Sequence, residues 1–373
     1  MAVTLGEAAG NGKMLMQNEL TKMLKPKIEQ LAAVLQKAKT ENRFVLVRFH
    51  HDADGISATF ALSEVLRFFA QQQNSAVYTV KDAIRDLSVV AHEEKPLITL
   101  LDFGMNAESA EGLNLIKAGG IELIVIDHHP PSKEAMGIPD FYLTPWEFSN
   151  ENDTSRYVAG YLVAEVAVAC GGDGDKCRKY AKTACAGDKS DLMDSDDEDK
   201  KRALVLDYLA ANSGYGNNLK FYKTVLKNDE LFQSMYTQAI EKIDDAAERA
   251  MKSMKERKFG DGKIYLVELE RLVKKGEFPN RSKITTRIFE KLKSDKPAIV
   301  IGTGKRMIIL RVNDAAVEMG AGANKIAEMV SGSMGDFVES GGGHVRAGAI
   351  KVKEGFVDSV VNAILKDLTR GIG

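Results

Sequence analysis

The sequence predicts an α/β protein in which a domain built on a parallel sheet precedes a smaller α/β domain. Short apolar runs at residues 44–49, 97–101 and 121–126 are typical of buried strands. Stretches with the apolar spacing of helices, at 57–70 and 108–118, lie between them. Because strands and helices alternate, we expect a parallel sheet with helices on both faces.

The rest of the chain completes this two-domain prediction. An N-terminal helix is expected at 17–39, and two further helices at 156–170 and 175–186. The charge run at 194–202 is typical of a solvated helix start. Later come a charged helix at 238–257, strands near 263–269, 298–301 and 307–312, a glycine-rich turn and a last helix at 355–368.

We therefore expect a first domain at 1–235, a helical connector at 236–257 and a second domain at 258–373, with the active site in the cleft between the domains. The 373 residues suffice for two separate cores.

Composition narrows the class of protein. Hydrophobic residues make up 44% and charged residues 28% of the chain, as in ordinary globular proteins. No apolar run approaches the roughly 20 residues that span a bilayer, and Met1 to Lys13 lack the pattern of a secretory signal. We expect a cytoplasmic protein without membrane partners. The three cysteines, an odd number without a CxxC pair, predict neither a disulfide framework nor a zinc site.

The charge distribution is uneven. The net charge is −2, but residues 251–311 contain 17 Lys and Arg against 7 Asp and Glu, a local balance of +10. An acidic part joined to a basic part is compatible with a metal site beside a phosphate-binding region.

Acidic and imidazole side chains follow each of the three apolar strands of the first domain. The segments are HHDADG at 50–55, DFG at 102–104, DHH at 127–129 and, after a predicted helix, GDKSD at 187–191. Ligand sites in parallel sheets gather at the carboxyl ends of the strands. We therefore expect these side chains to converge.

Such a set favours divalent cations. Carboxylates bind Mn²⁺ or Mg²⁺, and imidazoles shift the preference toward Mn²⁺. Asp52 and Asp54 are expected to face different ions around a tight turn that Gly55 permits, with Asp102 as the bridging carboxylate. Two ions about 3.5–4 Å apart activate water and stabilise the departing oxygen of a phosphate ester.

Together these segments resemble the four motifs of the DHH phosphoesterase superfamily. The resemblance implies that His50, Asp52, Asp102 and Asp188 hold one ion, and that Asp54, Asp102 and His128 hold the other. It further implies that His129 contacts the scissile phosphate and that Asp127 orients its neighbours. The ion in this superfamily is usually manganese.

A second resemblance lies near the C-terminus. Gly341, Gly342, Gly343 and His344 are similar to the GGGH motif of the DHH-associated C-terminal domain, where glycine backbone and imidazole contact phosphate. Its pairing with the upstream motifs argues against the pyrophosphatase branch. The family usually continues His-x-x-Ala-Ala-Gly, whereas this chain has AGA at 347–349.

Three basic residues are further candidates for substrate contact. Arg311, on the strand MIILR, occupies a position where the family often places an arginine that grips phosphate. Arg281 and Lys283, in a turn before a predicted helix, are expected to contact the substrate strand.

The arrangement most resembles the archaeal RecJ-like nucleases, which lack the oligonucleotide-binding barrel of bacterial RecJ. The first hypothesis is a manganese-dependent exonuclease on single-stranded DNA or RNA, with two ions, for which Mg²⁺ is an alternative. A phosphodiesterase for short oligonucleotides or cyclic dinucleotides is the nearest alternative. A non-catalytic replication scaffold is a third, which the complete set of ligand residues disfavours. Relatives of this kind can associate with replication-fork proteins, so the resemblance also implies a partner protein of that kind.

Overall fold

The computed structural model describes residues 14–149, 154–212, 219–273 and 277–370 and divides into two compact units, Met1–Tyr236 and Thr237–Gly373. The segment before Met14, on which the absence of a secretory signal was judged, lies outside the described residues. None of the described helices combines the length and apolar character that a bilayer-crossing segment needs.

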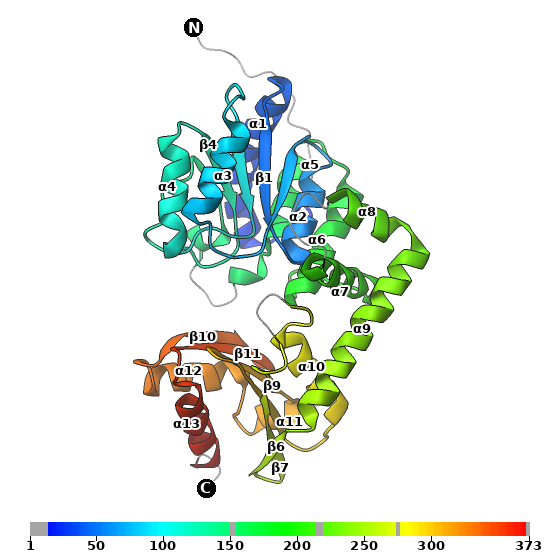
Figure 1. Cartoon of the computed structure of the whole chain (residues 1–373), viewed down its shortest axis with the longest axis vertical. Helices are drawn as coiled ribbons and strands as arrows, with labels where there is room; N and C mark the ends of the chain where they lie inside the picture. Colours follow the sequence, from blue (N-terminus) through cyan, green and yellow to red (C-terminus); the bar gives the residue numbers. More distant parts are fainter. Residues whose placement is uncertain (1–13, 150–153, 213–218, 274–276, 371–373) are drawn as a thin grey trace. The chain divides into compact units, whose positions relative to one another are not determined.

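Unit 1 contains a five-stranded parallel sheet in the order β2-β1-β3-β4-β5 (Figure 1). The strands are β1 (Val45–His50), β2 (Phe69–Gln73), β3 (Leu97–Leu101), β4 (Glu122–Ile126) and β5 (Phe141–Leu143). The helices are α1 (Glu19–Thr40), α2 (Ala53–Leu62), α3 (Val80–Val90), α4 (Ala110–Ala118), α5 (Ala159–Ala169), α6 (Gly174–Asp188), α7 (Asp197–Asn212) and α8 (Leu219–Lys227). Three 3-10 turns are η1 (Ala107–Ser109), η2 (Pro145–Glu147) and η3 (Thr154–Arg156).

The interior strand β1 shows why both faces of this sheet are covered. Val45, Val47 and Phe49 belong to the core formed with α1, α2, α5 and α6, whereas Leu46 belongs to a second core formed with α3 and α4. Successive side chains of a strand point to opposite faces, so a strand whose side chains are buried on both faces requires helices on both. The predicted doubly covered parallel sheet is confirmed.

Unit 2 contains a mixed six-stranded sheet in the order β10-β11-β9-β8-β7-β6, in which only β7 and β8 pair in parallel. Its strands are β6 (Lys255–Phe259), β7 (Gly262–Glu268), β8 (Ala298–Thr303), β9 (Met307–Val312), β10 (Val338–His344) and β11 (Ala347–Val352). Its helices are α10 (Arg281–Leu292), α11 (Asp314–Glu318), α12 (Ala323–Ser333) and α13 (Val357–Arg370), and α9 (Asp229–Met251) includes the boundary between the units. One core contains α12 and α13 residues and the other α9 and α10 residues.

Three local predictions were wrong. The helix expected at 57–70 ends at Leu62, and Phe69 begins β2, whose glutamines are hydrogen-bonded inside the unit and give no apolar signal. The helix expected at 238–257 ends at Met251, and residues from Lys255 pair with β7. The glycine-rich segment forms strand β10 rather than a turn, because it pairs with β11.

Candidate metal centre

The four motifs of unit 1 converge at the carboxyl edge of its parallel sheet. His50 ends β1, Asp102 follows β3, and His128 follows β4. Strands β1 and β3 are neighbours although β2 lies between them in the chain, so the strand order reverses between them. Ligand sites of open α/β sheets form at such a reversal. The topology therefore places the acidic and imidazole side chains where a site is expected.

Asp52 and Asp54 are held by different helix starts. Asp52 is the N-cap of α2, and its carboxylate accepts a hydrogen bond from Gly55 N at 3.0 Å. Asp54, fully buried, accepts hydrogen bonds from the backbone N–H groups of Ala159 and Gly160, at the start of α5. Backbone donors at a helix start favour an ionised carboxylate. The two carboxylates are thus fixed in separate orientations.

Two glycines permit these close approaches. A Cβ on Gly55 would lie 2.4 Å from His50 O, and a Cβ on Gly160 would lie 2.9 Å from Asp54 Oδ1. The expected role of Gly55 in a tight turn is corrected: Gly55 lies within α2, and its small size lets the helix pack on β1. Gly160 does the same for α5 against Asp54.

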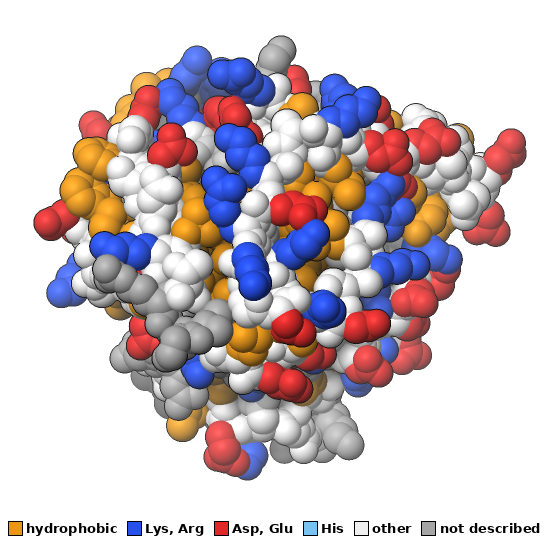
Figure 2. Space-filling view, turned by 90° about the horizontal axis from the view of Figure 1, so that it is seen from below, with side chains coloured by type: hydrophobic (Ala, Val, Ile, Leu, Met, Phe, Trp, Pro, Cys, Tyr) orange, Lys and Arg blue, Asp and Glu red, His pale blue; other side chains and the backbone are white. Residues whose placement is uncertain are grey.

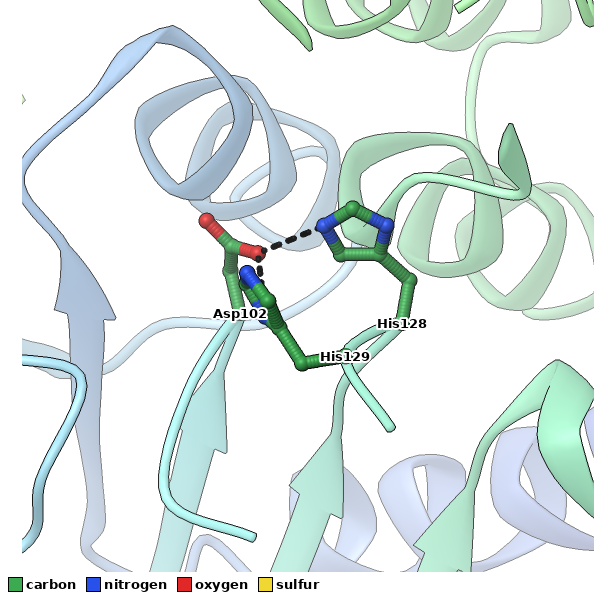
Figure 3. A group of neighbouring side chains, drawn as sticks. All are labelled: Asp102, His128 and His129. Atoms are coloured by element: carbon green, nitrogen blue, oxygen red, sulfur yellow. Dashed lines mark ion pairs between the residues drawn. The ribbon is translucent and has the colours of Figure 1, made fainter. Parts of the chain in front are cut away.

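Asp102 is the central carboxylate of the site. It is buried and has φ of +70°, a left-handed conformation that is unusual for a residue other than glycine. Its Oδ2 lies 3.5 Å from His50 Nδ1, and its Oδ1 lies 3.4 Å from His128 Nε2. Figure 3 shows the imidazoles of His128 and His129 directed toward this carboxylate. The two oxygens of Asp102 therefore face different sides of the cluster, Oδ2 toward His50 and Oδ1 toward His128.

The DHH segment supplies two imidazoles with different surroundings. His128 is buried, and its Nδ1 lies 2.6 Å from the carbonyl oxygen of Ser155. A ring N–H donated to that carbonyl leaves Nε2 as a ligand atom directed into the cluster. His129 has a half-exposed side chain, and its Nδ1 lies 2.8 Å from Asp127 Oδ1. This contact is the one that an orienting role for Asp127 requires.

Three donor sets suited to a cation emerge from the described residues. They are His50, Asp52 and Asp102; Asp54, His128 and Asp188; and Asp102, His128 and His129. Asp188 Oδ2 lies 3.2 Å from His128 Nε2, so the structure groups Asp188 with His128 and Asp54, whereas the resemblance assigned it to the ion held by His50. In each set the ligand atoms lie within 4.8 Å of one another.

Unsatisfied atoms show that these residues fit a divalent cation. His50 Nδ1, His128 Nε2 and both carboxylate oxygens of Asp102 are buried and lack a hydrogen-bond partner within the described chain. Buried polar atoms of this kind are costly unless something binds them. Carboxylate and imidazole donors together match Mn²⁺ or Mg²⁺.

The electrostatics lead to the same conclusion. Burial, followed by the charges of Asp102 and Asp188, raises the pKa of Asp54 well above its ordinary value. Burial, followed by the charge of Asp52, likewise raises the pKa of Asp102. Burial alone would lower the pKa of His128, but Asp102, Asp188 and Asp54 raise it well above its usual value. The carboxylates repel one another, and a bound cation relieves that repulsion.

Sequence reasoning missed three supporting groups. Ser155 O fixes the His128 ring, Trp146 donates its indole N–H to His128 O at 2.7 Å, and Asp207 Oδ1 accepts a hydrogen bond from Ala53 N at 2.8 Å. Trp146, the only tryptophan of the chain, was a recognisable candidate. The backbone contact of Ser155 leaves no sequence signal.

In unit 2, Gly341, Gly342, Gly343 and His344 lie on β10, the edge strand, and all four are exposed. Gly343 has φ of +142°, and a Cβ there would lie 2.3 Å from Ala347 O. Only glycine fits this hairpin end. The exposed edge leaves backbone that a ligand can approach, as the expected phosphate contact requires.

The side chains of two of the three basic candidates of unit 2, Arg311 and Arg281, are engaged internally. Arg311 is buried and donates hydrogen bonds to Thr286 Oγ1, Leu310 O and Ser282 Oγ at 3.0, 2.8 and 2.8 Å. Arg281 donates to Glu270 at 2.8 Å, and Lys283 N donates to Asn280 at 2.9 Å in the N-cap of α10. Their contact with substrate stays a prediction.

Several cations of the basic stretch at 251–311 are paired with carboxylates among the described residues. Arg287 and Lys291 pair with Asp244, and Arg306 pairs with Glu339. Figure 2 shows a face on which Lys and Arg side chains are interspersed with Asp and Glu. The local excess of +10 in the sequence therefore does not translate into an unpaired basic surface of the same size.

Comparison with known proteins agrees with the fold and the motifs. Residues 44–187 match the DHH family, N-terminal domain. An uncharacterized protein of Methanocaldococcus jannaschii is 25% identical over 96% of this chain, which spans 56% of that relative's length.

Two solved structures extend the likeness beyond the matched domain. The DHH domain of a protein described as a member of a family of ribosomal proteins has a TM-score of 0.74 at 24% identity, covering 95% of this chain and 93% of that one. RecJ of Thermus thermophilus, in complex with Mn²⁺, has a TM-score of 0.56 at 15% identity, covering 92% of this chain and 55% of that one. Residues 44–187 therefore match the DHH family, N-terminal domain, and the chain has a RecJ-like fold.

Proposed function

We propose that the chain is a manganese-dependent phosphodiesterase that removes nucleotides from an end of single-stranded DNA or RNA. The observation that carries the proposal is the position of Asp102, with one oxygen toward His50 and the other toward His128. The match of residues 44–187 to the DHH family supports hydrolysis of phosphate esters. The similar RecJ structures contain manganese, and one of them is described as an exonuclease. By analogy, we assign manganese as the ion and nucleic acid as the substrate.

Each residue of the centre has a role in this proposal. His50, Asp52 and Asp102 hold one ion, Asp54, His128 and Asp188 hold the other, and Asp102 is shared. When bound, two such ions lower the pKa of a water molecule and offset the charge of the phosphate oxygens. His129, half exposed beside Asp102, donates to the scissile phosphate, and Asp127 keeps its ring in place.

Unit 2 supplies substrate contacts. In this proposal the exposed Gly341–Gly343 backbone and His344 contact phosphate, with Arg311, Arg281 and Lys283 as further candidates. A partner protein of the replication fork belongs to the same analogy and rests on family resemblance alone.

A second candidate function is hydrolysis of short oligonucleotides or cyclic dinucleotides. The pairing of Arg287, Lys291 and Arg306 with carboxylates favours it. A long strand gains affinity from each phosphate that a free cation neutralises, and these cations are already engaged.

One assay tests both candidates. Purified protein is incubated with end-labelled DNA and RNA of graded length, a dinucleotide and a cyclic dinucleotide, with Mn²⁺, with Mg²⁺ or with chelator. Stepwise shortening of long strands in Mn²⁺ supports the exonuclease. Cleavage restricted to the shortest substrates supports the second candidate. Inertness toward every substrate with manganese supplied rejects both.

A further inference from the structure

Unit 1 has a pocket of about 270 Å³ that shares no residue with the metal centre. Its walls come from α2, α6, α7 and α8, which lie together in Figure 1. Its volume is near the lower end of the ~300–1,000 Å³ of pockets that bind small molecules. Every residue that lines it belongs to the described part of unit 1.

Positive charge dominates the wall of this pocket. Lys176, Lys179, Arg202, Lys223 and Lys227 line it, and Glu64 is the one acidic residue among the lining side chains. Glu64 already binds Lys176 at 3.0 Å and accepts a hydrogen bond from Tyr180 OH at 3.2 Å. The local charge is therefore positive and incompletely balanced.

Three of the lysines have no carboxylate within ion-pair distance among the described residues: Lys179, Lys223 and Lys227. Lys223 donates a hydrogen bond to Ser63 Oγ at 2.6 Å, and its ammonium lies 5.5 Å from the Phe60 ring centroid. Burial lowers the pKa of Lys223; the charge of Glu64 opposes this shift, and repulsion from Lys227 and Lys176 adds to it. Gathering like charges at a half-buried position costs free energy. An anion bound between them would offset that cost.

The pocket also has an apolar wall and an unsatisfied hydroxyl. Phe60 and Leu206 line it and are buried in the core of unit 1. Ser57 lines it as well, is 0% exposed, and its hydroxyl oxygen has no hydrogen-bond partner within the described chain. A buried hydroxyl without a partner calls for a ligand or a water molecule. The combination selects a ligand with an anionic group and an apolar, flat body.

We propose that this pocket binds a small organic phosphate of the nucleoside monophosphate class, with its phosphate on Lys179, Lys223 and Lys227 and its base against the wall of Phe60 and Leu206. A concave pocket with one apolar wall suits a single small ligand better than a nucleic-acid backbone, which requires an extended basic track. This site stands independently of the proposed hydrolytic function.

Two helices connect the pocket to the metal centre. Helix α2 has Asp52 as its N-cap and Asp54 in its first turn, and it carries Ser57 and Phe60 further along. Helix α6 carries Lys176, Lys179 and Tyr180 and ends at Asp188. A ligand in the pocket would therefore contact the two helices that also carry carboxylates of the metal centre.

Binding is tested by calorimetry on the full chain in chelator, with AMP, adenosine and inorganic phosphate as separate probes. Chelator keeps metal-bound phosphate out of the measurement and makes the result independent of hydrolytic activity. We expect AMP to bind more tightly than adenosine or phosphate alone. Lys223→Gln and Lys227→Gln should each weaken AMP binding by about tenfold, the loss of one charge-assisted hydrogen bond.

The matched control is Lys220→Gln, an exposed lysine of α8 that does not line the pocket. It should bind AMP as the unaltered chain does. The proposal is overturned if AMP does not bind at millimolar concentration, or if Lys220→Gln weakens AMP binding as much as the pocket variants do. It is also overturned if the pocket lysines affect only the binding of a single-stranded oligonucleotide.

Discussion

Two carboxyl groups of the metal centre in unit 1 and one carboxyl group of unit 2 have pKa values shifted in opposite directions. In unit 1, Asp54 and Asp102 are buried beside other carboxylates, and their pKa values are raised. In unit 2, Asp244 accepts hydrogen bonds from Arg287 at 2.8 and 2.9 Å, and these, with Lys291 and against partial burial, lower its pKa to about 2. One environment opposes the ionised form, and the other stabilises it.

This difference separates a binding site from a structural contact. The Asp244 group is complete, because each charge already has an opposite charge beside it. The cluster around Asp102 is incomplete, because its protein groups leave negative charge and buried ligand atoms without partners. Proteins retain such a destabilising arrangement where function requires it. The comparison therefore distinguishes residues suited to bind a cation from residues that stabilise the fold through ion pairs.

The sharpest way to break this comparison is to remove the shared carboxylate. Asp102→Asn should lower Mn²⁺-dependent turnover by about 10²–10³-fold, as loss of one fixed electrostatic contact does. Asparagine suits the φ of +70°, whereas alanine would add backbone strain. The rate on an end-labelled strand measures the effect, and circular dichroism checks the fold. Asp191→Asn, at an exposed position, is the control. Wild-type turnover in the Asp102 variant would remove Asp102 from the centre.

Metal should also stabilise the unit that contains the cluster. At Mn²⁺ concentrations near 100 times the Kd, the free energy of unfolding of unit 1 should rise by about 2.7 kcal/mol. Thermal unfolding with and without chelator measures this difference. Asp188→Asn should reduce the gain, and Asp191→Asn should preserve it. An unfolding temperature indifferent to Mn²⁺ would mean that the cluster binds no manganese.

The strand ends of unit 1 were predictable because an apolar strand followed by a charged motif is a local signal. His50, Asp102 and His128 could be expected to meet, since parallel strands end at the same edge. Strand β2 was missed because Gln72 and Gln73 are polar, and the residues that hydrogen-bond them inside the unit include distant ones, Ala210 and Arg48. A one-dimensional pattern does not reveal such partners.

The detailed chemistry of the centre depended on contacts between distant segments. The left-handed backbone of Asp102, the contact of His128 with Ser155 O, and the backbone hydrogen bonds to Asp54 join parts of the chain that are far apart in sequence. In unit 2, the surroundings of Arg311 likewise depend on a segment that is distant in sequence. Its position on a strand was predictable, but its burial depends on α10.

Arg311 tests whether the unit 2 cations are structural. Arg311→Gln removes most of its three hydrogen bonds, one buried and two partly buried, and we expect a loss of about 2 kcal/mol from the free energy of unfolding of unit 2. Arg306→Gln, at an exposed ion pair, should cost less than about 0.5 kcal/mol. Chemical denaturation measures both. A stable Arg311 variant with a raised KM would instead assign this guanidinium to substrate.

The smallest effect should come from the completed charge group. Because the pKa of Asp244 in the folded protein is about 2, below its ordinary value, its contribution to stability is present above about pH 4 and is lost as the pH falls through about 2. The side chain is 27% exposed and screened by solvent, so we expect about 1 kcal/mol. Asp244→Asn should remove this contribution at pH 7 but change little at pH 2, as measured by urea unfolding. Asp245→Asn, with 69% of its side chain exposed, is the neighbouring control. An equal loss at both pH values would show that the helices need the shape of Asp244 rather than its charge, and the contrast with Asp102 would then rest on packing.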